Sequence, residues 1–229
     1  MQDLETGFIL IDKPLKMTSH NVVNQLRKIT KIRKIGHAGT LDPLASGLLI
    51  LAIGRSATKN IQQYIKLDKT YIADIKLGAI STTYDQEGEI KKIKSDKIGL
   101  QQIKTIIKNF TGQIKQVPPM FSAKKIKGQK LYHLARQGKE IKRPAQKIEI
   151  FYINILKYNW PDLKIKVKCS SGTYIRSLAY DIGQQLGCGA YLAGLKRIKI
   201  GQYKLDNAIK ISKINKKNWH KHIMPERSK

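Results

Sequence analysis

A glycine- and proline-rich segment near the N-terminus carries the residue that is best suited to do chemistry. Residues 36–47 read GHAGTLDPLASG, so Asp42 lies directly before Pro43 and between flanking glycines. Proline disfavours the helical conformation for the residue before it, which keeps Asp42 extended. Glycine lets the backbone approach a ligand closely. The segment therefore predicts a structured loop that presents one carboxylate at a fixed angle, although Asp-Pro also occurs in ordinary turns, which are the commoner explanation from spacing alone.

The charge balance indicates the kind of partner. The chain has 44 Lys and Arg against 16 Asp and Glu, a formal net charge of +28. Such a field attracts polyanions and releases counterions when nucleic acid binds. Lysine usage driven by an AT-rich genome is the alternative explanation. We find no run of eighteen apolar residues and no basic amphipathic helix with aromatic anchors, so we expect no membrane partner.

Other common kinds of site have no motif in this sequence. The two cysteines cannot build a disulfide framework, and no Cys/His cluster suggests zinc. The sequence has no GxxxxGK[ST] phosphate loop and no GxGxxG that follows a strand. Residues 1–11 carry Asp3 and Glu5 without a preceding basic region, which is not typical of a signal peptide. We therefore expect a cytoplasmic protein that needs no metal.

Hydrophobic periodicity predicts the elements that must position the loop. Strands read as short apolar or alternating runs, and helices as apolar stripes such as Val22, Leu26 and Ile29 after a possible cap at Ser19. We expect strands at 7–12, 48–53, 71–77, 148–156 and 163–169, an extended stretch at 191–203, and helices after Ser19 and at 56–65, 100–110, 131–137, 173–186 and 205–214. The fold class is α+β, with a mixed, mostly antiparallel central sheet and flanking helices.

Five sequence blocks stand out along the chain. They are LIDKP at 10–14, GHAGTLDPLASG at 36–47, KTY at 69–71, PMFSAKK at 119–125 with KLY at 130–132 and ARQG at 135–138, and CSSGTYIR at 169–176. In this order the blocks resemble the TruB family of tRNA pseudouridine synthases, and the resemblance spans residues 7–205. It implies the pseudouridine synthase fold, with a basic RNA-binding insertion at about 119–147.

The resemblance implies a reaction and three catalytic residues. The family isomerises uridine 55 in the T loop of tRNA: it flips the base, breaks the bond from uracil N1 to ribose C1′ and joins C5 to C1′. Asp42 would be the nucleophile, and whether its adduct forms at the sugar or on the base stays open. Arg176 would favour the ionised carboxylate, or else be a surface phosphate contact. Tyr71 would stack on the flipped uracil, or else be a core aromatic.

Four further residues match positions near the substrate in the family. His37 would help to hold the flipped nucleotides, and Tyr174 and Leu195 would line the uracil pocket. Lys13 would lie near the site and position the backbone, and a direct catalytic role for it is the less favoured alternative. Tyr174 and Leu195 could equally be ordinary core packing, and a lone histidine such as His37 is usually structural or exposed. Their roles come from the resemblance and not from their spacing.

The resemblance also implies partners and organisation. We expect one catalytic domain at 1–211, a short, basic, loosely packed tail at 212–229 and no full PUA domain of the kind that bacterial members usually carry. The expected partner is the T-arm stem-loop of tRNA, bound by a monomer without a guide RNA. An isomerisation needs no cofactor. The rival functions are a non-catalytic RNA-binding protein and a guide-dependent or rRNA-directed synthase.

Overall fold

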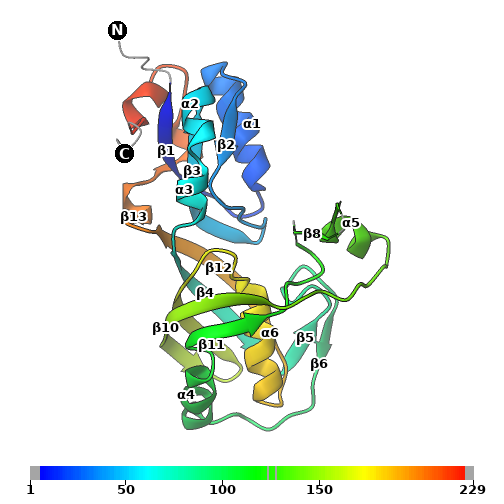
Figure 1. The fold of residues 1–229 in the computed structure, drawn as a ribbon. Coiled ribbons are helices and arrows are strands. Elements are labelled where there is room, and N and C mark those ends of the chain that lie inside the picture. Colours follow the sequence, from blue (N-terminus) through cyan, green and yellow to red (C-terminus); the bar gives the residue numbers. More distant parts are fainter. Residues whose placement is uncertain (1–5, 123, 127, 225–229) are drawn as a thin grey trace. The chain divides into compact units, whose positions relative to one another are not determined.

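The protein consists of two compact units, and the sequence of the second is inserted within the sequence of the first. The computed structural model describes residues 6–122, 124–126 and 128–224. Unit 1 comprises Met1–Tyr71 and Leu195–Lys229, and unit 2 comprises Ile72–Gly194. Two strands, β4 (Lys69–Leu77) and β12 (Ala190–Ile200), carry the chain from one unit to the other (Figure 1). Unit 1 is therefore built from both ends of the sequence.

Unit 1 contains the strands on both sides of the Asp42 segment. In the strand order β14-β1-β3-β12, β3 pairs antiparallel with β1 and parallel with β12, and β14 pairs parallel with β1. β2 adds to β3, and β13 adds to β12. The bounds are β1 (Gly7–Lys13), β2 (Ile35–His37), β3 (Ala45–Ile53), β13 (Tyr203–Lys204) and β14 (Ile209–Lys210). Nearly every side chain of β1 and β3 is buried, as in strands covered on both faces.

Helix α1 (Ser19–Thr30) covers this sheet with the apolar face that the sequence predicts. Val22 and Leu26 are fully buried in a cluster with Ile9 and Ile11 of β1. The capping residue is Thr18 and not Ser19: the Thr18 side chain accepts a hydrogen bond from the amide of Asn21. The stretch predicted as one helix at 56–65 forms two short ones, α2 (Gly54–Lys59) and α3 (Gln62–Ile65).

The prediction of a helix at 205–214 is wrong. The segment forms the 3₁₀ turns η1 (Leu205–Asn207) and η2 (Ile211–Lys213), with β14 between them. Pairing of β14 with β1 satisfies its backbone within the sheet, which outweighs the helix-like spacing of its apolar residues. The tail is also packed more closely than expected, at least as far as residue 224. Ile214 is 5% exposed, and Trp219, the first residue of η3 (Trp219–His222), is 3% exposed. Both pack in the core of unit 1.

In unit 2 the strand order is β12-β4-β11-β10-β7, and the unit also carries two smaller hairpins, β5-β6 and β8-β9. Helix α6 follows β11 and begins at the CSSGTYIR block. The strands are β5 (Ala79–Ser81), β6 (Ile90–Lys92), β7 (Gly112–Gln116), β8 (Lys125–Ile126), β9 (Gln129–Lys130), β10 (Gln146–Asn159) and β11 (Asp162–Cys169), and the helices are α4 (Leu100–Lys108), α5 (Leu131–Arg136) and α6 (Ile175–Gln185). The predicted α+β class with a mixed, mostly antiparallel sheet is confirmed.

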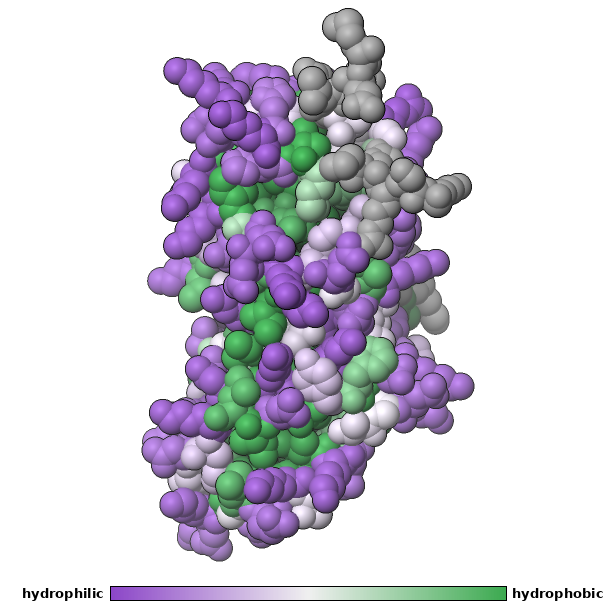
Figure 2. All heavy atoms as spheres, turned by 90° about the vertical axis from the view of Figure 1, so that its left-hand side faces the viewer, coloured by the Kyte–Doolittle hydropathy of each residue, from purple (hydrophilic) through white to green (hydrophobic). Residues whose placement is uncertain are grey.

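The surface reflects the composition. Figure 2 shows one face on which hydrophilic side chains project over most of the area, with apolar side chains in patches between them. With 44 basic and 16 acidic residues in the chain, most of the charged side chains are cationic. Among the residues that the structure describes, no helix is long and apolar enough to cross a membrane.

Candidate active site

Asp42 lies in the loop between β2 and β3 of unit 1, and backbone hydrogen bonds hold the loop on its C-terminal side. The Asp42 carbonyl accepts a hydrogen bond from the Ala45 amide at 3.0 Å. The next carbonyl, that of Pro43, accepts one from the Lys16 amide at 2.8 Å. Asp42 itself is half-buried, between the buried Leu41 and the half-buried Pro43. The carboxylate thus stands on a tight, tethered turn at the surface of the core.

A serine from helix α1 holds the loop on the other side of Asp42. The hydroxyl of Ser19 accepts a hydrogen bond from the Leu41 amide at 2.8 Å and donates one to the Leu41 carbonyl at 3.0 Å. Ser19 and Leu41 are 2% and 3% exposed, so both bonds are shielded from water. One side chain thereby satisfies both backbone polar groups of Leu41, the residue before Asp42. Ser19 was predicted as a helix cap, and its contact with the loop was not predicted.

Strands β3 and β12 meet directly after the loop, and only glycine fits at the junction. Leu195 pairs with Ala45, and Arg197 pairs with Gly47, in parallel register. Gly47 has a φ of +101°, and a Cβ atom there would lie 2.3 Å from the Arg197 carbonyl oxygen. This close approach brings Leu195, which the sequence predicts at the uracil pocket, beside the C-terminal end of the Asp42 loop.

Lys13 and Tyr71 are both buried in unit 1. The Lys13 side chain is fully buried at the end of β1, and its Nζ donates to the Pro14 carbonyl at 2.9 Å and the Met17 carbonyl at 2.5 Å. These bonds fit the role of positioning the backbone, because they fold the segment that supplies the Lys16 amide. Tyr71 is 8% exposed and sits near the start of β4.

His37 ends β2, and its surroundings favour the neutral form of its imidazole. Burial lowers the pKa of its imidazole, and the charges of Arg197 and His20 lower it further. The His37 Nδ1 atom is buried and has no hydrogen-bond partner in the structure. A neutral imidazole with one unsatisfied nitrogen can donate or accept a hydrogen bond from a ligand, depending on its tautomer.

In unit 2, Arg176 is buried within a network of acceptors at the start of helix α6. Its Nη1 is 3.1 Å from the Asp85 carboxylate, and the two side chains are 7% and 2% exposed. Its Nη2 donates to the Phe121 carbonyl at 2.8 Å. The alternative of a surface phosphate contact is therefore wrong for Arg176. Its guanidinium ties α6 to the start of the basic insertion.

Asp85 belongs to this network and was not predicted. Its carboxylate also accepts hydrogen bonds from the Thr83 hydroxyl at 2.6 Å and from the Glu87 amide at 3.0 Å. These bonds satisfy further lone pairs of the buried carboxylate. The sequence STTYDQEG around Asp85 has the composition of a solvated turn. No local signal distinguishes it from one, because its partner lies 91 residues away.

Two further contacts lock the start of α6. The buried Gln116 side chain accepts a hydrogen bond from the Tyr174 amide at 2.8 Å and donates one to the Tyr174 carbonyl at 3.0 Å. The Ser177 hydroxyl donates to the Val117 carbonyl at 3.0 Å. The end of β7 therefore fixes the backbone on both sides of Arg176, and with it the half-buried ring of Tyr174.

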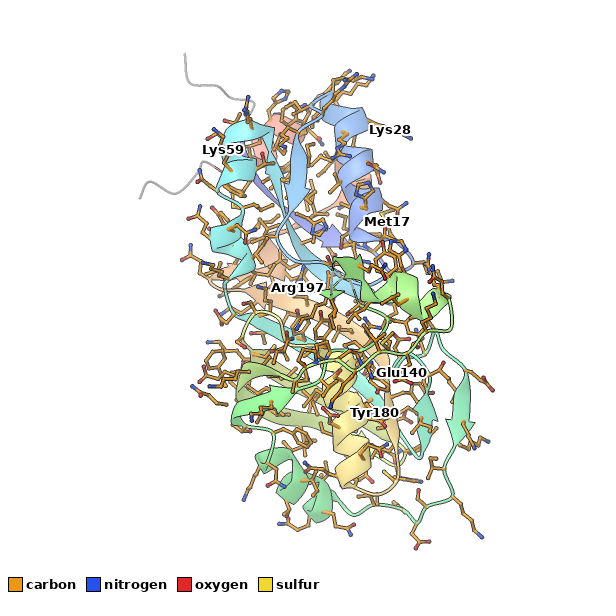
Figure 3. The ribbon with its side chains drawn as sticks, turned by 45° about the vertical axis from the view of Figure 1, so that its right-hand side comes forward. Met17, Lys28, Lys59, Glu140, Tyr180 and Arg197 are labelled. Carbon is orange, nitrogen blue, oxygen red and sulfur yellow. The ribbon has the colours of Figure 1, made fainter. Side chains whose placement is uncertain are left out.

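The basic insertion is anchored near both of its ends. The Lys124 Nζ donates to the Gln146 side chain at 2.7 Å. Arg143 pairs with Glu140 at 3.2 Å, and Figure 3 marks Glu140 and Tyr180 in this part of unit 2. The predicted helical patch forms α5, whose Leu131 is fully buried.

The structure thus distributes the predicted site residues over both units. Unit 1 holds Lys13, His37, Asp42, Tyr71 and Leu195, and within it the strand register brings Leu195 to the end of the Asp42 loop. Unit 2 holds Tyr174 and Arg176, which are neighbours at the start of α6.

Comparisons with known proteins identify the chain. The model of the N-terminal domain of the TruB family of pseudouridylate synthases matches residues 27–175. The model of the C-terminal domain of tRNA pseudouridylate synthase B matches residues 176–227. The tRNA pseudouridine synthase B of Clostridium tetani is 46% identical over 96% of this chain and 76% of that protein. The protein of the same name from Clostridium acetobutylicum is 48% identical over 95% of this chain and 75% of that protein.

Solved structures agree on the fold. A chain from the crystal structure of a Cbf5-Nop10-Gar1 complex is 29% identical, with a TM-score of 0.74 over 97% of this chain. A chain from an H/ACA RNP bound to a substrate RNA is 27% identical, with a TM-score of 0.71. This protein spans 60% of the length of each of those chains. Fold and sequence place it among the pseudouridine synthases, which are enzymes. Within that class, the chain belongs to the TruB family of pseudouridylate synthases.

Proposed function

We propose that this enzyme converts uridine 55 in the T loop of tRNA to pseudouridine, with Asp42 as the nucleophile. The observation that carries the proposal is the loop that presents Asp42. Ser19 holds the residue before it, and the Lys16 amide holds the residue after it. A nucleophile must meet the reacting carbon within a few tenths of an ångström, and a tethered turn provides that accuracy. The bacterial relatives at 46–48% identity carry the name tRNA pseudouridine synthase B, which supports tRNA as the substrate.

The reaction is an isomerisation, and it needs no cofactor. The target nucleotide flips out of the T loop, the bond from uracil N1 to C1′ breaks, and the base turns so that its C5 bonds to C1′. The proton leaves C5, and another is taken up at N1, so atoms and electrons balance within the substrate and water. The Asp42 carboxylate supplies the negative oxygen that carries the intermediate.

The other predicted residues take supporting roles in this proposal. Tyr71 stacks on the flipped uracil and replaces part of the stacking lost from the RNA. Tyr174 and Leu195 line the pocket around the base. Arg176 is the third catalytic residue of the proposal, and the buried Asp85 orients its guanidinium.

RNA binding is assigned to the cationic surface and to two regions. His37, whose buried Nδ1 has no hydrogen-bond partner in the structure, contacts the opened T loop. The basic side chains of the insertion at 119–147 contact phosphates along the RNA backbone. Such contacts position the substrate and carry no sequence information. Lys13 positions the backbone next to the site through its hydrogen bonds to the Pro14 and Met17 carbonyls. The enzyme acts without a guide RNA, which the higher identity to the tRNA enzymes than to the H/ACA protein supports. We also expect it to act as a monomer.

The test is to measure pseudouridine formation at each position of a T-arm stem-loop, with RNA affinity measured in parallel. Asp42→Asn should abolish turnover and leave the affinity nearly unchanged, because an amide has no anionic oxygen and most of the affinity comes from phosphates. Asp206→Asn, at an exposed aspartate of the same unit, is the matched control and should behave as wild type. Substantial turnover by Asp42→Asn would contradict the role of Asp42. Modification of rRNA fragments but not of the stem-loop would contradict the substrate.

A further inference from the structure

A second buried arginine, Arg197, spans the Asp42 loop from end to end. Its side chain leaves β12 within unit 1 (Figure 3) and is 1% exposed. The Nε atom donates to the Leu48 carbonyl at 2.7 Å, and Nη2 donates to the Gly39 carbonyl at 3.0 Å. Gly39 lies three residues before Asp42, and Leu48 lies six residues after it. One planar guanidinium therefore fixes the distance between the two ends of the segment 39–48.

The backbone of the same segment is shaped to receive Arg197. Gly39 has a φ of +94°, a conformation that other residues rarely adopt, and it turns its carbonyl toward the guanidinium. Gly47 lies against the backbone of Arg197, where no Cβ would fit. Both glycines at the ends of the loop are thus matched to this one residue, which contacts the segment through its backbone and its side chain.

Packing alone does not explain a guanidinium at this position. Among the residues that the structure describes, Arg197 makes no ion pair, and neutral carbonyls are its hydrogen-bond acceptors. A charge removed from water without an opposite charge is costly, and an apolar side chain of similar size would fill the space without that cost. The charge also acts on its surroundings, because it helps to lower the pKa of His37. Arg197 therefore supplies directed hydrogen bonds and charge at the loop.

We propose that Arg197 is a positioning residue for the isomerisation, holding the segment 39–48 so that Asp42 stays in register with the reacting carbon. The proposal rests on the proposed function, in which Asp42 is the nucleophile. Arg197 acts through the loop and does not itself touch the substrate. Its loss should lower the rate of the chemical step while RNA binding persists, because a side chain that is 1% exposed offers no surface for a phosphate contact.

The test uses two variants of the full chain and a matched control. Arg197→Lys keeps the charge but cannot reach both carbonyls with a rigid fork, and Arg197→Met keeps the packing without the charge. Arg27→Lys is the control, because the Arg27 Nη2 also holds a carbonyl of unit 1, that of Ile35, at 3.2 Å, but none in the segment 39–48. Single-turnover rates, affinity for a T-arm stem-loop and amide hydrogen exchange are measured for all three.

Both Arg197 variants should lose about 10- to 100-fold in single-turnover rate, the scale that a misplaced catalytic group causes. Their RNA affinity should stay within about threefold, since phosphate contacts dominate it. Faster amide exchange should be confined to residues 39–48. Wild-type rates, or rate losses that follow losses in affinity, would overturn the proposal, and so would variants that do not fold at all. If wild type itself formed no pseudouridine in the stem-loop, the proposed function would fail, while the exchange data would still show whether Arg197 holds the loop.

Discussion

Replacing Ser19 with alanine removes two buried hydrogen bonds through the loss of one oxygen atom. The Leu41 amide and carbonyl would both lose their partner, at a site where Ser19 and Leu41 are 2% and 3% exposed. A buried backbone group without a partner costs about 1–3 kcal/mol. Two such groups, partly relieved by movement of the loop, give a loss of about 2–4 kcal/mol in the free energy of unfolding. That is a large fraction of the total for a typical domain, about 5–15 kcal/mol.

The neighbouring hydroxyl provides the control. Thr18 caps the same helix through the amide of Asn21 but makes no hydrogen bond to the loop. Thr18→Ala should cost about 1 kcal/mol, as for other helix caps. Its turnover should remain that of wild type, whereas Ser19→Ala should also turn over more slowly under conditions in which it is fully folded, because Asp42 follows the loosened Leu41.

The assay is urea unfolding followed by tryptophan fluorescence. The chain has two tryptophans, and Trp219 is 3% exposed in the core of unit 1. Carrying out the measurements in a Trp160→Phe background leaves Trp219 as a reporter of unit 1 alone. If Ser19→Ala cost no more than Thr18→Ala and kept the wild-type rate, the loop would not depend on this hydroxyl, and the argument from its two hydrogen bonds would be refuted.

Three more predictions concern unit 2. Arg176→Lys should reduce turnover by more than about tenfold in a folded protein, because an ammonium group cannot serve the Asp85 carboxylate and the Phe121 carbonyl together. Asp85→Asn should destabilise unit 2 by about 3–5 kcal/mol, as when one member of a buried ion pair is removed. A near-wild-type rate for Arg176→Lys, or near-wild-type stability for Asp85→Asn, would show that the pair is a generic contact. Burial raises the pKa of Asp181 to about 6, so folding favours its neutral form. The stability from this group is present below about pH 4 and is lost as the pH rises through about 6. Relative to Asp181→Asn, wild type should therefore lose unfolding free energy from pH 4 to pH 7, and parallel pH curves for the two proteins would contradict this.

The sequence was informative where a signal is local. The Asp-Pro pair with its glycines predicts the tethered loop, and the apolar runs of β1 and β3 predict buried strands. The contacts that hold the site are long-range: Ser19 and Leu41 are 22 residues apart, and Asp85 and Arg176 are 91 residues apart. A hydroxyl or carboxylate in a polar stretch carries no mark of such a partner.

The wrong helix at 205–214 has a related cause. Its apolar residues recur at helix-like intervals, but Ile209 lies opposite Ile11 in the parallel pairing with β1. Such a segment becomes a strand where it can pair with a free sheet edge, and the hydrophobic periodicity of the sequence does not show where that edge lies. The role of Arg176 came from the family resemblance, and its partner Asp85 came only from the structure.

The interleaving of the two units has a consequence for how the enzyme comes into being. The N-terminus of a chain leaves the ribosome first. All of unit 2 therefore emerges before the second part of unit 1, residues 195–229, has been synthesised. The guanidinium that bridges the Asp42 loop belongs to a residue 158 positions after Gly39. Unit 2 can complete its fold during translation, whereas the first 71 residues must wait for the last strands of their own sheet. The nascent enzyme is therefore expected to stay inactive until both β12 and β14 have left the ribosome, and stalled chains of increasing length would gain activity in one step after β14.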